Sequence, residues 1–205
     1  MENTSLDEQI LQHKGGIAIN SLTKVMQIDE DQENQPRLIK HSPYHEIKTM
    51  TNLVSNSKNS FSILTMNIQC IRTKFQELKI FLQRLREKNC TFSAICIQET
   101  WLSTHEDLKQ YELPDYKLFD QPYSCTSKGG LIIYLHNKFK HGKKINFTES
   151  NIWEGLVIEI KKGENLTKPL FLGNIYRPPN NINENFHQFT TEFAPNLENQ
   201  KKKLP

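Results

Sequence analysis

A strand–helix–strand pattern between residues 61 and 98 limits what this chain can fold into. Phe61 to Met66 is a mostly apolar, β-rich run, and Ser93 to Ile97 is a second one. Between them, apolar residues recur at steps of three and four, which predicts an amphipathic helix. The stripe consists of Phe75, Leu78, Leu82 and Leu85. Two strands joined by one helix are expected to be parallel neighbours with a right-handed crossover.

Both predicted strands are followed by a polar side chain. Asn67 comes after the first strand, and Gln98 and Glu99 come after the second. Because parallel strands end at the same edge of a sheet, we expect Asn67 and Glu99 to lie close together. An acidic side chain at the carboxyl end of a strand is a common element of metal and phosphate sites in α/β proteins.

The chain after residue 100 is predicted to be mainly antiparallel. Strands are expected at residues 116–119, 131–135, 153–160 and 170–176, and a closing helix at residues 185–194. Residues 137–144 are interpreted as a basic turn, and Gly129 and Gly130 as a site of close backbone approach or positive φ. One strand–helix–strand unit followed by antiparallel strands indicates a two-sheet α/β sandwich.

Composition predicts that part of the chain does not pack. Hydrophobic residues make up 36% of the sequence, against roughly 45–50% in globular proteins. Residues 1–59 are rich in Asn, Gln, Ser and acidic residues, which predicts a disordered polar leader before a packed domain at residues 60–205. The leader has a net charge of −2 and the remainder +5, which mildly favours a polyanionic partner.

The sequence also narrows the expected cell compartment. The four cysteines lack the spacing of a zinc site or a disulfide framework, so reduced thiols are expected. No apolar run approaches the ~18 residues of a membrane span, and the first residues lack a secretory apolar region. We therefore expect an intracellular protein of the nucleus or cytoplasm with no membrane partner.

Four short motifs resemble, in order and approximate spacing, those of the endonuclease/exonuclease/phosphatase family. They are Leu64-Thr-Met-Asn-Ile68, Ile97-Gln-Glu-Thr-Trp-Leu102, Gly129-Gly-Leu-Ile-Ile-Tyr134 and Asn174-Ile-Tyr-Arg-Pro-Pro179. The most similar branch is the apurinic-type endonuclease domain of non-LTR (LINE-type) retrotransposon proteins. Each motif alone is common by chance, whereas the ordered set is specific.

The resemblance implies a Mg²⁺-dependent (or Mn²⁺-dependent) DNA endonuclease that nicks phosphodiester bonds. Glu99 would bind the metal, since Mg²⁺ prefers oxygen ligands. Asn67 would orient the metal-binding groups or the attacking water, and Tyr176 would donate a hydrogen bond to a phosphate oxygen. Arg177 would contact the DNA backbone through its forked guanidinium. No small-molecule cofactor is implied, and the oligomeric state is left open.

Each of these residues also has a simpler interpretation. Asn67 suits a turn after a strand, Glu99 could be a solvated carboxylate, and Tyr176 could be an interfacial aromatic residue. A basic group at residues 138–144 could meet DNA phosphates or could be a solvated hairpin tip. The lysines proposed for DNA contact are Lys138, Lys140 and Lys143.

The family's second set of motifs, Gly-Asp-x-Asn and a late Asp-His pair, is not found in this sequence. No Asp follows Asp120, and the one His after Arg177 is His187, which Phe186 precedes. We therefore expect a C-terminally incomplete sandwich, a truncated remnant with weak or no nuclease activity. The alternatives are a non-catalytic nucleic-acid-binding fragment and a phosphoinositide or lipid phosphodiesterase relative on the same fold.

Overall fold

The computed structural model describes residues 61–123, 129–146 and 153–177, together with residues 189, 191–193 and 195. The predicted leader at residues 1–59 and its boundary lie outside these ranges. The strands are β1 (Ile63–Asn67), β2 (Ala94–Gln98), β3 (Tyr116–Gln121), β4 (Leu131–His136), β5 (His141–Asn146), β6 (Glu154–Ile160) and β7 (Leu170–Tyr176). The helix α3 spans Ile71–Glu87, and a 3₁₀ helix, η1, spans Leu108–Tyr111.

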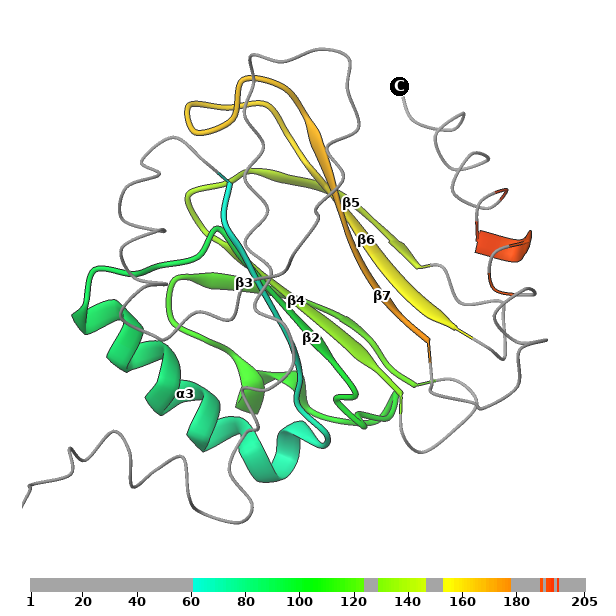
Figure 1. Cartoon of the computed structure of the whole chain (residues 1–205). Helices are drawn as coiled ribbons and strands as arrows, with labels where there is room; N and C mark the ends of the chain where they lie inside the picture. The colour runs from blue at the N-terminus through cyan, green and yellow to red at the C-terminus, as the bar shows by residue number, and fades with distance from the viewer. Residues whose placement is uncertain are drawn as a thin grey trace, which may run out of the picture.

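The strands form two sheets that face each other (Figure 1). The first has the order β1-β2-β4-β3, and the second has the order β5-β6-β7. β1 and β2 are parallel, as the crossover predicts, and all other neighbouring strands are antiparallel. With α3 on the outer face of the first sheet, this is the predicted two-sheet α/β sandwich.

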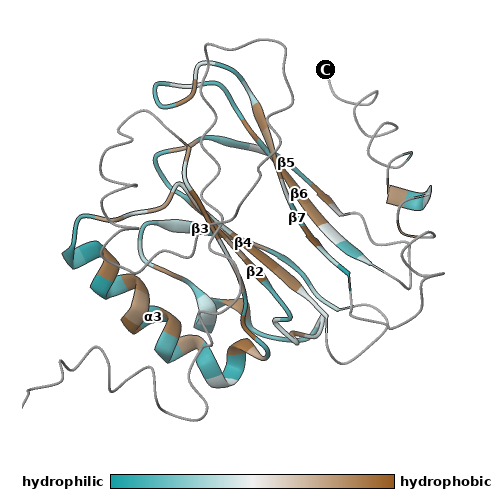
Figure 2. Cartoon of the chain, viewed as in Figure 1, coloured by the Kyte–Doolittle hydropathy of each residue, from teal (hydrophilic) through white to brown (hydrophobic). Residues whose placement is uncertain are grey.

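α3 forms where the apolar stripe predicts a helix. Its buried residues, Ile71, Phe75, Leu78 and Leu85, pack in one apolar cluster with residues of β1 and β2. Figure 2 shows hydrophobic and hydrophilic stretches alternating along the helix. Asn89 has a left-handed φ of 56° just beyond the helix, a conformation that often ends helices. None of the described helices is both long and apolar enough to cross a membrane.

Two apolar layers surround the central strands. The first layer lies between α3 and the first sheet, and the second lies between the two sheets. The five residues of β4 from Leu131 to Leu135 alternate between these layers and have no exposed surface. Removal of so much apolar surface from water is the main force that holds the sandwich together.

Two expectations for the second sheet were wrong. Residues 137–144 are not one turn, because β5 begins at His141 and pairs with the edge of β6, with a register shift between His141 and Lys144. Lysines are common on such edge strands, where they discourage pairing with other chains. The alternating pattern of residues 153–160 also predicts a strand with one buried face, whereas β6 is covered on both faces, because Trp153 packs against Phe189 and Phe193.

The predicted closing helix is described only in part. Residues 189, 191–193 and 195 are helical, and the remainder of the predicted range lies outside the described residues. Phe189 and Phe193 stack on each other with ring centroids 5.3 Å apart. Their contacts with Trp153 place this segment on the outer face of the second sheet (Figure 1).

Candidate active site

Three of the predicted site residues meet at one edge of the sandwich. Asn67 ends β1, Tyr176 ends β7 in the other sheet, and Glu99 directly follows β2. The Asn67 amide nitrogen Nδ2 donates a hydrogen bond to Glu99 Oε1 at 2.6 Å, and the Tyr176 hydroxyl donates to the same oxygen at 2.7 Å. The structure thus places an amide and a phenol on one carboxylate oxygen.

The two oxygens of Glu99 have different surroundings. Oε1 accepts both hydrogen bonds, whereas no described residue donates a hydrogen bond to Oε2. Glu99 is half-buried as a residue, and its carboxylate is held by the two bonds to Oε1. A carboxylate with one fixed oxygen and a second oxygen that accepts no bond from the described residues is suited to binding a cation.

Asn67 serves the turn and the site with opposite ends of its amide. Its Oδ1 accepts a hydrogen bond from the Gln69 backbone N–H at 3.1 Å, which is the local turn bond typical of Asn. Its Nδ2 is thereby directed toward Glu99. The turn interpretation and the site interpretation of Asn67 therefore describe the same conformation.

Tyr176 is held as a hydrogen-bond donor. Burial raises the pKa of its phenol well above the usual value, and the hydrogen bond to Glu99 and the charges of Glu99 and Glu154 raise it further. Only 8% of the residue is exposed. The phenol therefore keeps its proton at neutral pH, and its O–H points at a negatively charged group.

The loops that carry these side chains have an unusual backbone. Of the six described non-glycine residues with positive φ, four lie here: Gln69, Cys70, Glu99 and Trp101, at 48°, 82°, 53° and 55°. Each such residue costs about 1–2 kcal/mol relative to a right-handed conformation. Concentration of backbone strain in two adjacent loops is typical of functional sites.

The strained loops support each other through backbone hydrogen bonds. The Cys70 N–H donates to the Glu99 carbonyl at 2.9 Å. The N–H groups of Thr100 and Trp101 donate to the carbonyls of Gly130 and Gly129, at 3.1 and 2.9 Å. Gly130 has a φ of 92°, and a Cβ there would lie 2.5 Å from Thr100 Oγ1, so this turn requires glycine as predicted.

Glu154 is a second carboxylate near the site that sequence reasoning missed. It is 7% exposed and lies directly opposite Tyr176 in the pairing of β6 with β7. One of its oxygens accepts a hydrogen bond from the Gly130 N–H at 2.6 Å. The signal that could have revealed it is an acidic residue at the start of an otherwise apolar strand.

The predicted DNA contacts are separated by the fold. Arg177 follows Tyr176 and is half-buried at the same edge. Lys138, Lys140 and Lys143 lie beyond the other end of β4, because β4 runs antiparallel to β2 and leaves the Glu99 edge. The structure therefore does not bring these lysines to Glu99.

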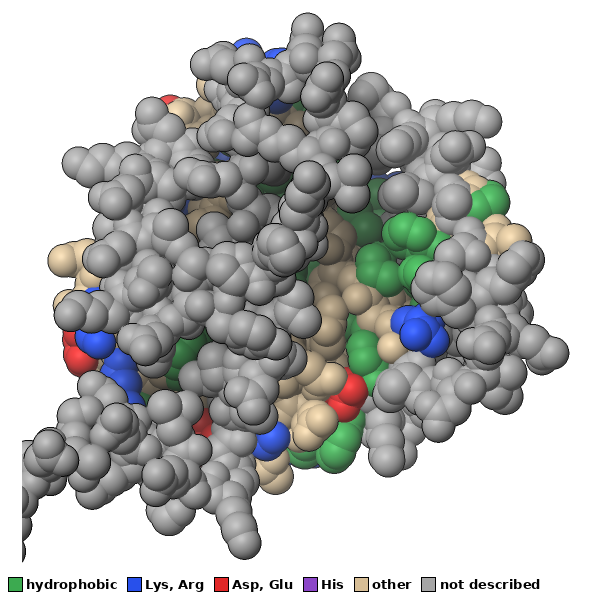
Figure 3. All heavy atoms as spheres, in the orientation of Figure 1, with side chains coloured by type: hydrophobic (Ala, Val, Ile, Leu, Met, Phe, Trp, Pro, Cys, Tyr) green, Lys and Arg blue, Asp and Glu red, His purple; other side chains and the backbone are tan. Residues whose placement is uncertain are grey.

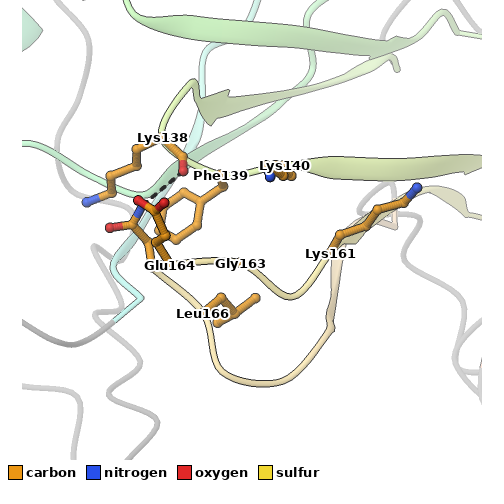
Figure 4. Close-up of a pocket in the computed structure, with 8 residues that line it drawn as sticks. Lys138, Phe139, Lys140, Lys161, Gly163, Glu164 and Leu166 are labelled. Carbon is orange, nitrogen blue, oxygen red and sulfur yellow. Dashed lines mark hydrogen bonds between the residues drawn. The ribbon is translucent and has the colours of Figure 1, made fainter.

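The far end of the second sheet contains a small pocket. It is lined by Lys138, Phe139, Lys140, Lys161, Gly163, Glu164, Asn165 and Leu166. The amines of Lys138 and Lys161 point in opposite directions rather than into one spot (Figure 4). On the face shown in Figure 3, the described Lys and Arg side chains are also scattered rather than clustered.

Comparison with known proteins identifies the fold. No family model and no curated protein matches the sequence. Among solved structures, the catalytic domain of human Nocturnin, with a bound sulfate anion, superimposes with a TM-score of 0.52 at 12% identity, covering 68% of this chain and 58% of that domain. The sandwich is of the endonuclease/exonuclease/phosphatase type.

The chain spans between half and three fifths of the length of these structures. A truncated TDP2 from Caenorhabditis elegans is also similar, with 16% identity, 64% of this chain and 50% of that chain covered, and a TM-score of 0.41. The fold assignment rests on the Nocturnin domain. At identities this low, the similarity concerns the fold, and function has to be argued from the site.

Proposed function

We propose that Glu99, Asn67 and Tyr176 form part of a Mg²⁺-dependent site that nicks phosphodiester bonds of DNA, in a chain derived from a retrotransposon endonuclease. One observation carries this proposal. The two donors share a single oxygen of Glu99 and leave its second oxygen without a bond from any described residue. An arrangement built only for stability would not need a half-accessible carboxylate between two donors.

The donor set fits a magnesium or manganese ion. The described residues contain no cluster of three or more His, Cys, Asp or Glu side chains. Mg²⁺ does not require one, because it usually binds through one or two carboxylates and completes its shell with water and substrate phosphate oxygens. Glu99 would hold the ion through Oε2. When bound, the ion polarises the phosphate and stabilises charge on the leaving oxygen.

The other side chains act on the carboxylate and on the substrate. Asn67 holds Glu99 Oε1 without adding a charge that would repel DNA. Tyr176 keeps its proton, and its single O–H can turn from Glu99 Oε1 to a phosphate oxygen of the substrate as negative charge develops there. Arg177 lies next to it in the sequence and can fork onto a neighbouring phosphate. These residues bind and orient the phosphodiester, and they stabilise the negative charge that develops on its phosphate oxygens in the transition state.

We expect the activity of these 205 residues to be weak. The resemblance attributes water activation to an Asp in the Gly-Asp-x-Asn motif, and this sequence has no Asp after Asp120. General-base catalysis contributes typically about 10²–10⁴-fold to a rate. Slow nicking that depends on Glu99 is therefore the expected result.

A supercoiled-plasmid nicking assay with Mg²⁺ tests the proposal. Glu99→Gln and Tyr176→Phe should remove nicking above background. Tyr116→Phe is a matched control, because it also deletes a phenol that donates at 2.9 Å, but to the Phe92 carbonyl away from the site. Nicking that survives Glu99→Gln would refute the proposal. So would hydrolysis of a short-chain phosphoinositide in place of plasmid, which would favour the lipid-directed alternative.

We also propose, as a second candidate, non-catalytic binding of nucleic acid. The supporting observation is the lysine-lined pocket formed by the β4–β5 and β6–β7 turns, far from Glu99. Its test is fluorescence anisotropy with labelled DNA at increasing salt. Binding that weakens with salt, is lost in the combined Lys138→Gln, Lys140→Gln and Lys161→Gln variant and occurs without nicking would select this function.

A further inference from the structure

A buried amide joins the two sheets next to the candidate site. Asn174 is 2% exposed and lies on β7. Its Nδ2 donates hydrogen bonds to the carbonyls of Ile97 on β2 and Ile132 on β4, at 2.9 and 3.1 Å. One side chain of the second sheet therefore binds two neighbouring strands of the first.

A second amide completes this connection. Gln98 Nε2 donates to Asn174 Oδ1 at 3.2 Å and to the Ile175 carbonyl at 3.0 Å. Asn174 thus uses both donors and its acceptor, and every bond crosses between the sheets. Gln98 immediately precedes Glu99, and Asn174 lies two residues before Tyr176 on the same face of β7.

The remainder of the contact between the sheets is mainly apolar. Leu131, Ile133, Leu156, Ile158 and Leu172 pack there with other hydrophobic residues. Apolar packing holds the two sheets together but is non-directional, so it does not fix their relative position. Hydrogen bonds require a narrow range of distance and angle, so a fully satisfied buried network selects one arrangement of the sheets. A buried Asn is costly without such partners, and an apolar residue of similar size would fill the same space.

We propose that Asn174 is a positioning residue that, together with Gln98, fixes β7 against β2 so that the Tyr176 hydroxyl meets Glu99. The expected effect on the nicking rate rests on the proposed function. The expected effect on the position of the Tyr176 hydroxyl relative to Glu99 does not, because it concerns only the contact between the two sheets. A displacement of 1 Å would take the 2.7 Å bond between Tyr176 and Glu99 out of hydrogen-bond range. Misplacement by that distance can cost about 10²-fold in rate.

The test compares Asn174→Leu with Leu172→Ala in the full chain. Leu172 lies on the same strand and in the same apolar layer, so Leu172→Ala weakens packing and leaves the amide network in place. Asn174→Leu should lower the maximal nicking rate about 10–10²-fold with unchanged DNA binding, whereas Leu172→Ala should not.

A second measurement does not require nicking. In protein labelled with [ζ-¹³C]tyrosine, the Tyr176 resonance at pH 7, assigned with Tyr176→Phe, has a chemical shift that depends on the hydrogen bond to Glu99. Glu99→Ala removes the acceptor and gives the chemical shift without this bond. In Asn174→Leu the chemical shift should move to that value, whereas Leu172→Ala should behave like the wild type. If the wild type does not nick, the proposed function fails and this chemical shift alone decides the positioning role.

Gln98→Leu is a second test variant that can be used if Asn174→Leu does not fold. It removes two of the bonds but keeps those from Asn174 to Ile97 and Ile132, so an intermediate chemical shift of Tyr176 is expected. If the Tyr176 chemical shift is that of the wild type in both amide variants, the positioning role is refuted. A loss of rate in Leu172→Ala as large as that in Asn174→Leu would also refute it.

Discussion

Gly130→Ala should destabilise the protein for two separable reasons. The residue has a φ of 92°, where an L-residue is strained. The new Cβ would also lie 2.5 Å from Thr100 Oγ1. Thr100 is only 1% exposed, so its side chain has no space into which to move. The turn itself supports the loop that carries Glu99.

The two contributions can be estimated from the structure. The strained backbone should cost about 1–2 kcal/mol. Overpacking in a well-filled site costs about 1–3 kcal/mol. Gly130→Ala should therefore lower the free energy of unfolding by about 2–5 kcal/mol. In a Thr100→Ala background the overlap with Oγ1 is gone, so the same substitution should cost only about 1–2 kcal/mol.

Urea unfolding of the wild type, both single variants and the double variant gives the coupling energy, which should be about 1–3 kcal/mol. Gly163→Ala is the matched control, because no heavy atom lies within 4 Å of its Cβ position and its φ is not positive. It should change stability by less than about 1 kcal/mol. Equal costs of Gly130→Ala in the two backgrounds, or a cost no larger than that of Gly163→Ala, would contradict the reasoning.

Three further predictions concern other parts of the molecule. Burial raises the pKa of Cys96 to about 12 from a usual 9.0. Between these pH values the Cys96 thiol ionises only in the unfolded chain, so the free energy of unfolding falls as pH rises. From pH 9 to 11 this fall should be less steep in Cys96→Ala, by up to about 1.4 kcal/mol per pH unit. Leu78→Ala in the core should cost about 2–5 kcal/mol in urea unfolding, whereas Ile80→Ala, 53% exposed, should change stability by less than about 0.5 kcal/mol. Asn67→Asp places a second carboxylate against Glu99, so it should cost about 1–3 kcal/mol at pH 7 and much less at pH 4, where one carboxyl can hold a proton.

Much of the first sheet could be predicted because its signals are local. The stripe that includes Leu78 and Leu85 is periodic, and the strands on either side of it are apolar runs. The helical crossover then predicts that β1 and β2 are parallel. Because parallel strands end at the same edge of the sheet, Asn67 is expected beside Glu99. The fold class was predicted correctly for the same reason. The chemical roles of these residues stay predictions.

The contacts between the sheets could not be predicted in this way. No periodicity indicates which face of β7 meets β2, so Gln98 and Asn174 received no role. Tyr176 was selected by its motif alone, and the structure brings it to Glu99 through pairing across 77 residues. The edge strand β5 was missed because a short segment with two Lys and one Gly lacks the alternation of a half-buried strand. The position of Lys138 depends on the direction of β4, which only the sheet order reveals.

The single oxygen shared by Asn67 and Tyr176 has a consequence for folding. Asn67 and Glu99 belong to one sheet and are separated by 32 residues, whereas Tyr176 comes from the other sheet, 77 residues after Glu99. Contacts between residues so distant in the sequence require closure of long loops and are slow to form. We expect the pair of Asn67 and Glu99 to form when the first sheet does, and Tyr176 to join it only when the second sheet docks. The complete site would then form only after both sheets are in place. Partial unfolding of the second sheet would remove Tyr176 from the site while the pair of Asn67 and Glu99 is still formed.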